Sequence, residues 1–283
     1  MTARLRDCMP LLDRLCYLGW RLTRRTTPIS VRLHQGIRVR IRPWPAMDIA
    51  MAHEVFVLNV YDPPDGVHLR PDSVRRAVDL GANIGCTCLL WLARYPKACV
   101  EAFEPHPTYA ALLRQNLALN GWGDRVKLHE AAAGTAEGTM FLTDAEAFSH
   151  VVAEAGRDRV PDAMAAFLEA DGRGGISAEP RERLPIRVKD AFVALREEPI
   201  DLLKIDIEGG EHALLEDARF ATLPVRVLVM EWHDTEEHPD GQVHVRERLA
   251  SCGYHIVSHL DCISGNGQWS TGVIWAVRVA GEN

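Results

Sequence analysis

The sequence of 283 residues lacks an apolar run long enough to cross a membrane. The uncharged stretch at residues 80–93 is shorter than the ~20 apolar residues that a spanning helix needs, and it contains Gly81, Asn83 and Gly85. The basic N-terminus has no clean apolar segment followed by a small-residue cleavage site, so we expect no secretory signal.

A framework of paired cysteines is missing as well. The seven cysteines are an odd number and are scattered, and Cys86 and Cys88 are separated by one residue instead of the two in a redox or zinc motif. We therefore expect reduced cysteines that act as small apolar side chains in a cytoplasmic protein. The sequence also shows no internal repeat.

Positive charge is scarce outside the N-terminus. The net charge is −7, yet residues 1–42 contain ten arginines against two aspartates, so the remainder is strongly acidic. An acidic body argues against nucleic-acid binding, which needs a basic face. Residues 4–25 predict an amphipathic helix that either packs on the core through its leucines or makes a weak contact with an anionic membrane surface. We favour packing on the core.

From residue 76 the sequence alternates between apolar strands and helices, a pattern typical of a parallel sheet covered on both faces. The strands are predicted at 77–81, 98–104, 125–130, 184–189, 200–206 and 225–231. Two last strands, at 254–260 and 272–279, have no helix-length spacer and should pair antiparallel. We predict an α/β fold, with a Rossmann-like, seven-stranded, mostly parallel sheet and a terminal antiparallel strand pair.

The predicted sheet belongs to a domain at 71–283, which an irregular insertion at 144–182 interrupts. Residues 1–70 are expected to form a small N-terminal cap or substrate region, with strands at 29–33 and 36–42 and a helix at 46–60. We expect the insertion, with a helix at 160–170, to fold over a substrate as a lid. Ser149 and His150 are its candidate contacts.

The first strand of the alternating region ends in the glycine-rich turn VDLGANIG, at 78–85. In such sheets, ligands bind beyond the carboxyl ends of the strands, where the strand order reverses. Gly81 allows the sharp turn, and Gly85 allows a ligand or a helix to approach the backbone. Glu104 ends the second strand, where its two oxygens can accept hydrogen bonds from the two hydroxyls of a ribose.

The turn lacks the glycines of the dinucleotide motif G-x-G-x-x-G. Those positions would be Gly81, Asn83 and Cys86, and the last two side chains would crowd a pyrophosphate. S-adenosylmethionine has no phosphates, and its positive charge suits the acidic Asp79. We predict this cofactor, and an NAD-dependent oxidoreductase is an alternative.

Four stretches together resemble the FkbM-type methyltransferase family: VDLGANIG, AFEPHPTYAALLRQNLALNG, AAAGTAEGTMFL and IDLLKIDIEGGEHALL. The specific parts are D-I-E-G-x-E at 206–211 and E-P-H-P at 104–107. The resemblance implies a class I methyltransferase architecture and S-adenosylmethionine-dependent O-methylation, often of sugars or secondary metabolites. It implies cofactor contacts from Asp79, Gly81, Asn83, Gly85, Glu104 and Pro105. Asn120, in the matching Asn-Gly pair, is either a helix cap or a ligand contact.

Methylation of an alcohol needs a base that takes the hydroxyl proton while the oxygen attacks the methyl group. The candidates lie at or after the fourth strand of the predicted sheet: Asp206, Glu208, His212 and His233. We assign the catalytic roles to Asp206, Glu208 and His233, and expect His212 on the surface. Lys204 should share a strand face with the two acids, so an ion pair is the structural alternative. Glu211 equally fits a structural role, because an acid in the first turn of a helix complements the helix dipole and caps its free N–H groups.

A divalent cation is not expected, although Asp206, Glu208 and His233, together with Glu211, offer a weak site for Mg²⁺ or Mn²⁺. No N-P-P-[YF] stretch follows the strand at 200–206, which favours an oxygen acceptor over the exocyclic amine of adenine. The expected partner is a small molecule or glycan, with its pocket built from loops at 44–70, 144–182 and 234–245. A non-catalytic cofactor-binding module is the remaining alternative.

Overall fold

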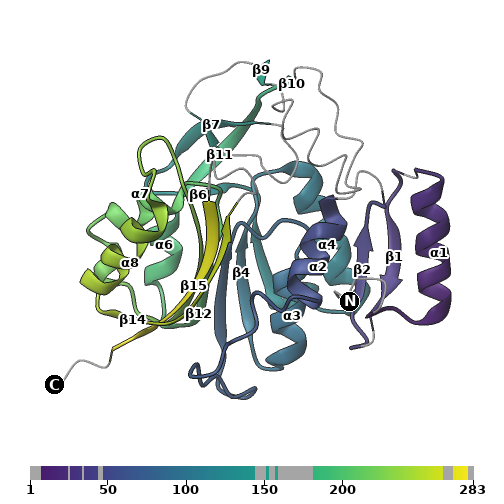
Figure 1. Cartoon of the computed structure of the whole chain (residues 1–283), viewed down its shortest axis with the longest axis horizontal. Coiled ribbons are helices and arrows are strands. Elements are labelled where there is room, and N and C mark those ends of the chain that lie inside the picture. Colours follow the sequence, from purple (N-terminus) through teal and green to yellow (C-terminus); the bar gives the residue numbers. More distant parts are fainter. Residues whose placement is uncertain are drawn as a thin grey trace.

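The computed structural model describes residues 8–24, 26–33, 35–43, 47–143, 151–152, 157–158, 181–263 and 270–279. Its main element is a seven-stranded sheet of order β14-β15-β13-β12-β3-β4-β5 (Figure 1). In chain order the strands are β3 (Arg76–Leu80), β4 (Cys99–Phe103), β5 (Val126–His129), β12 (Ile200–Ile205), β13 (Val225–His233), β14 (Tyr254–Ile263) and β15 (Ser270–Arg278). The first five run parallel, and β15 is antiparallel to both β13 and β14. The predicted α/β fold and its antiparallel pair are confirmed.

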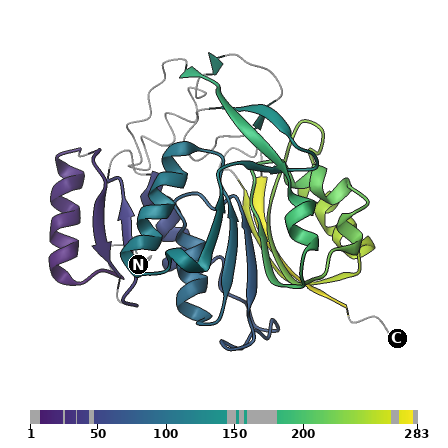
Figure 2. The same ribbon diagram turned by 180° about the vertical axis from the view of Figure 1, so that it is seen from behind.

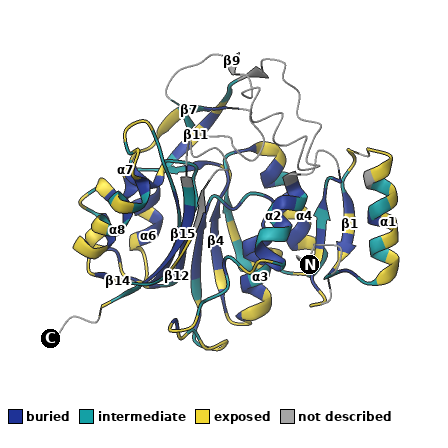
Figure 3. Cartoon of the chain, viewed as in Figure 1, coloured by how far each residue is buried: buried dark blue, intermediate teal, exposed yellow. Residues whose placement is uncertain are grey.

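Helices cover both faces of this sheet, and Figures 1 and 2 show them from opposite sides. One face carries α2 (Met47–Phe56), α3 (Cys86–Arg94) and α4 (Pro107–Asn120), and the other carries α6 (Ala191–Arg196), α7 (Glu211–Glu216) and α8 (Gly241–Ser251). The buried apolar side chains form two large clusters accordingly, and the strands are the most buried elements (Figure 3). Short 3₁₀ turns lie at Gly123–Arg125 and Phe220–Thr222.

A second, four-stranded sheet lies over the carboxyl ends of the central strands (Figure 1). Its order is β6-β11-β7-β8, from β6 (Ala132–Gly134), β7 (Gly138–Leu142), β8 (Val151–Val152) and β11 (Leu184–Asp190). The strand predicted at 184–189 belongs here and not to the large sheet. Along it exposed and buried residues alternate, as in Arg187 and Val188, which suits a strand covered on one face only. A pair of two-residue strands, β9 (Arg157–Asp158) and β10 (Arg181–Glu182), completes the described part of the insertion.

The N-terminal region forms α1 (Leu11–Leu22) and a hairpin of β1 (Ile29–Arg32) and β2 (Arg38–Ile41). The amide side chains of Asn116 and Asn120 on α4 bind the backbone of β2 along the edge that is not paired with β1. The Arg38 N–H donates to Asn120 at 2.9 Å, and Asn120 donates to the Arg38 carbonyl at 2.7 Å. Asn120 is therefore occupied by β2, and Gly121, with φ 70°, is the residue that caps α4.

The expectation that α1 packs on the core through its leucines is confirmed for Leu18 only. Leu11, Leu12 and Leu15 are more than half exposed, whereas Tyr17 is buried and Trp20 packs against the core. The aromatic side of the helix faces inward because aromatic rings bury more apolar surface than leucines. None of the described helices is long and apolar enough to cross a membrane.

Several expectations concern residues that the structure does not describe. Ser149, His150 and the helix at 160–170 lie outside the described residues, as does most of the proposed lid at 144–182. The domain limits at 70 and 71 stay a prediction.

Candidate active site

A cavity of about 680 Å³ lies between the carboxyl ends of β3, β4 and β12 and the second sheet. A smaller cavity of about 170 Å³ lies beside it, towards β13. The two share wall residues on α2, on the glycine turn and after β12: Met51, Gly81, Asn83, Asp206 and Glu208. Because β3 and β12 are the neighbours at which the strand order reverses, both cavities lie where α/β sheets bind ligands.

The glycine turn is shaped by two close approaches of the chain. Gly81 has φ 84°, and a Cβ atom there would lie 1.8 Å from the carbonyl oxygen of Asp206, so only glycine lets β3 and β12 end side by side. Gly85 has φ 87°, and a Cβ atom there would lie 2.9 Å from Leu113 on α4. Gly81 and Asn83 line the large cavity, whereas Gly85 allows α3 and α4 to pack.

Glu104 is buried in the wall of the large cavity, between the glycine turn and α4. One carboxylate oxygen accepts a hydrogen bond from the Asn83 N–H at 2.8 Å, and the other from the His106 N–H at 2.7 Å. Burial raises the pKa of Glu104 to about 7, although both hydrogen bonds oppose the rise. Each oxygen keeps a second lone pair, so the carboxylate can accept two further donors. Pro105 lines the same wall.

Asp79 lies beneath the turn and is fully buried. Its oxygen is 3.2 Å from Nζ of Lys204, which stands directly opposite it on β12, and its other oxygen accepts from the thiol of Cys88. Lys204 also donates to the Gly81 carbonyl at 2.8 Å and pairs with Asp206 at 3.0 Å. Burial opposes its charge, yet Asp206 and Asp79 raise the pKa of Lys204. The structure therefore gives Asp79 an ion pair and places it outside both cavity walls.

Acids converge on the smaller cavity from two neighbouring strands. Asp206 and Glu208 follow β12, and Glu231 lies on β13. The Tyr61 hydroxyl is 3.0 Å from Asp206 and 3.0 Å from Glu231, but it has one proton to donate. One of the two contacts therefore needs a protonated carboxyl. Burial and the nearby charge of Asp206 raise the pKa of Glu231 to about 7, whereas the pKa of Asp206 is lowered, so Glu231 is the acid that holds a proton more readily.

His233, at the end of β13, is held by a fully buried acid on the neighbouring helix. Its Nδ1 lies 2.9 Å from Glu211, which also accepts from the His233 and Gly209 backbone N–H groups. Its Nε2 is directed at Glu208, 3.5 Å away. Burial lowers the pKa of His233, but the hydrogen bond with Glu211 and the charges of Glu211, Glu208 and Glu231 together outweigh burial and raise the pKa to about 10. These acids therefore favour the charged form of the imidazole.

Glu208 has a left-handed backbone conformation, with φ 53°, that residues other than glycine rarely adopt. Burial and the neighbouring acids raise the pKa of this carboxyl well above its usual range. Strained backbone and a displaced pKa in one residue are typical of functional sites. One atom each of Asp206, Glu208 and His233 lies within 4.8 Å of the others, so these residues have the spacing of a cation site.

The structure thus brings most of the expected site residues to the two cavities. Gly81, Asn83, Glu104 and Pro105 line the large one, His233 the small one, and Asp206 and Glu208 both. His212 is not on the surface: it is buried beneath His233 and donates to its carbonyl at 2.8 Å.

Sequence reasoning missed Tyr61 and Glu231. Glu231 had a usable signal, because it stands two residues before His233 and therefore points to the same face of the strand. Tyr61 had none, since it lies 145 residues from Asp206 in the chain.

Comparison with known proteins adds to this geometry. The model of the methyltransferase FkbM domain matches residues 79–256. Methyltransferase sdnD from Sordaria araneosa is 31% identical over 57% of this chain and 68% of its own length. The 31-O-demethyl-FK506 methyltransferase FkbM from Streptomyces tacrolimicus is 32% identical over 69% and 78%. The 2-O-methyltransferase NoeI from Sinorhizobium fredii is 28% identical over 64% and 71%.

Proposed function

Because the chain belongs to the FkbM methyltransferase family, it is a methyltransferase, and we propose that it transfers the methyl group of S-adenosylmethionine to a hydroxyl oxygen of a sugar, a glycan or a secondary metabolite. One observation carries the proposal: the buried Glu104 carboxylate stands in the wall of a large cavity that adjoins an acidic one. The relatives' names, with 31-O- and 2-O-methylation among them, support oxygen as the acceptor atom.

The large cavity fits the cofactor in volume and in chemistry. About 680 Å³ lies within the usual range of small-molecule sites, about 300–1,000 Å³. Phe103, Met140 and Val188 offer apolar contacts for an adenine ring, and Glu104 offers acceptors for the ribose hydroxyls. Among the described residues no lysine or arginine lines this cavity, which disfavours the pyrophosphate of NAD.

The smaller cavity supplies the acid–base chemistry. When bound, S-adenosylmethionine supplies a methyl group on a positively charged sulfur. Asp206 and Glu208 stand between the two cavities and provide negative charge for that sulfur and for an incoming hydroxyl. Glu208 is the base we favour, because it lines both cavities and its ionised form faces His233.

His233 then acts as a charged partner of the base. With Nδ1 held by Glu211, its Nε2 faces Glu208 and stabilises the ionised carboxylate before it takes the hydroxyl proton. Lys204 keeps Asp206 in place from below. The set of Asp206, Glu208 and His233 also fits Mg²⁺ or Mn²⁺, so a cation that orients an acceptor diol is the secondary form of the proposal.

Two measurements test the proposal. Calorimetry with S-adenosylmethionine and with NAD⁺ should detect binding of the first only. A methyl-transfer screen with radiolabelled S-adenosylmethionine over sugars, nucleotide sugars and polyketides, run with and without Mg²⁺, should then label a hydroxyl acceptor.

The variants Asp206→Asn and Glu208→Gln should keep cofactor binding and lose transfer. NAD⁺ binding would replace the proposal with an oxidoreductase. Full transfer activity in both variants would remove the acids from the mechanism.

A further inference from the structure

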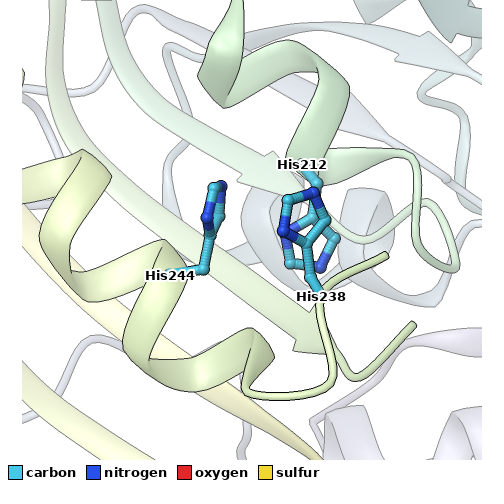
Figure 4. Close-up of side chains that lie close together, drawn as sticks. All are labelled: His212, His238 and His244. Atoms are coloured by element: carbon cyan, nitrogen blue, oxygen red, sulfur yellow. The ribbon is translucent and has the colours of Figure 1, made fainter. Parts of the chain in front are cut away.

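Three histidines meet behind the candidate active site, between α7 and α8 (Figure 4). His212 lies on α7, His238 in the loop before α8, and His244 on α8. One ligand atom from each lies within 4.8 Å of the others. The ring centroids of His238 and His244 are 4.1 Å apart, and those of His212 and His238 are 4.3 Å apart. This histidine cluster has no part in the proposed methyl transfer.

Two nitrogens of the cluster are buried without a partner. His212 is 3% exposed, and its Nε2 must donate to the His233 carbonyl, because a carbonyl can only accept. In the neutral ring Nδ1 therefore carries a free lone pair, and it has no hydrogen-bond partner among the described residues. The Nε2 of His244 is likewise buried and without a hydrogen-bond partner in this part of the chain. Buried polar atoms of this kind call for an explanation such as a bound ion.

An acid lies beside two of the three histidines. Glu216 stands four residues after His212 on α7, so the two share one face of the helix. Its Oε1 lies 3.4 Å from His238 Nε2 and 3.6 Å from His244 Nε2. Three imidazoles and one carboxylate are ligands that zinc accepts in four-coordinate sites.

We propose that His212, His238, His244 and Glu216 bind a Zn²⁺ ion. The rings of His212 and His238 stack with 22° between their planes, so their nitrogen lone pairs lie in nearly parallel planes and do not converge on one point. His238, which lies in a loop and is the less buried of the two, turns about its side-chain bonds to bring its nitrogen to the ion. The second nitrogen of His212 is already fixed by a backbone carbonyl, as in many zinc sites.

The ion would have a structural role that bears on the active site. It would join the first turn of α7 to α8, and His212 contacts the backbone of His233 directly. Glu211, which holds the His233 ring, is the neighbour of His212 in the chain. Zinc would thus steady the Glu211–His233 pair without touching the reacting atoms. The oxygen-richer set of Asp206, Glu208 and His233 is a different site that suits Mg²⁺.

The test is metal binding by the full chain, measured independently of activity. Purified protein is stripped with a chelator, titrated with Zn²⁺ against a chromophoric competitor, and examined with Co²⁺, whose visible spectrum reports tetrahedral coordination. We expect one Zn²⁺ per chain and, at a zinc concentration about 100-fold above Kd, a melting temperature higher by about 5 °C.

Matched variants locate the site. His238→Gln and His244→Ala should each weaken zinc binding at least about tenfold. Removing a direct ligand should cost at least as much affinity as removing a residue that only hydrogen-bonds to a ligand. His255→Ala, an exposed histidine on β14, should leave binding unchanged. Circular dichroism checks that each variant is folded, and the Co²⁺ spectrum of the unaltered protein tests the site without any variant.

The proposal is overturned if the stripped protein takes up no stoichiometric Zn²⁺ or if the bound Co²⁺ is not tetrahedral. It is equally overturned if zinc binding survives in His238→Gln and His244→Ala and is lost in Asp206→Asn, because the ion then lies in the acidic cavity. None of these results bears on the binding of S-adenosylmethionine, so the two proposals fail separately.

Discussion

Replacing Glu104 with glutamine removes the charge that we place opposite the ribose hydroxyls and keeps the side chain's shape. The carboxylate accepts from the Asn83 and His106 N–H groups at 2.8 and 2.7 Å, which leaves one lone pair on each oxygen for a ligand. Hydrogen bonds to a charged group contribute about 1.5–3 kcal/mol each, and a neutral amide retains only part of this. We expect the affinity for S-adenosylmethionine to fall by about 2–3 kcal/mol, or about 30- to 150-fold in Kd.

The pH dependence of cofactor binding should follow from the same interaction, and its direction can be predicted. Burial raises the pKa of Glu104 to about 7, and two hydroxyl donors favour the ionised form, so ligand binding lowers this pKa again. Below pH 7 the carboxyl must lose a proton for the ligand to bind. The affinity should therefore fall up to about tenfold for each pH unit below 7 and level off above it.

Calorimetry at pH 6, 7 and 8 checks both expectations. Glu198→Gln is the matched control, because Glu198 is exposed and precedes β12 at the opposite end of the strand. Ionisations of the cofactor itself appear in all three proteins and cancel when the profiles are compared. Unchanged affinity in a folded Glu104→Gln protein, or a pH profile identical to that of the unaltered protein, would refute the reasoning.

Three further predictions concern the frame of the site. Lys204→Met leaves Asp79 buried without a counter-charge and should lower the free energy of unfolding by about 3–5 kcal/mol in urea titrations; an unaffected midpoint would contradict the ion pair. Gly81→Ala puts a Cβ atom 1.8 Å from a carbonyl and should cost at least ~1 kcal/mol more than Gly121→Ala, which also has positive φ but open space around it. His233→Gln should lower kcat about 10²-fold or more and change the Kd of the cofactor by no more than a few-fold. If the affinity for the cofactor falls as much as kcat, His233 belongs to cofactor binding instead.

The large sheet could be predicted from the sequence because its central strands are buried on both faces and are almost uninterrupted apolar runs. VRVLVM in β13 is an example. Helix α8 could not be predicted in the same way, since only Val245 and Leu249 among its larger side chains are buried, too few for a helical period. Most of the leucines of α1 that we expected to face inward are exposed, because the helix has two apolar sides and periodicity does not say which one packs.

The candidate site was predictable where a residue's role depends on its neighbours in the chain. Glu104 ends a strand and receives N–H groups from the turn and from His106, two residues on. Asp79 looks the same in sequence, an acid near a strand end, but its partner Lys204 is set by the pairing of β3 with β12. Which residues meet across two strands depends on the register in which the strands pair, and the pattern of a single sequence does not reveal that register.

The two asparagines that hold β2 recognise main-chain atoms only, so they place almost no demand on the identity of residues 38 and 40. Any amino acid except proline offers the same N–H, so this attachment does not itself require arginine at either position. Only the alternating positions, Val39 and Ile41, are committed to the interior. The sequence of β2 can thus change at residues 38 and 40 while its attachment to α4 stays intact.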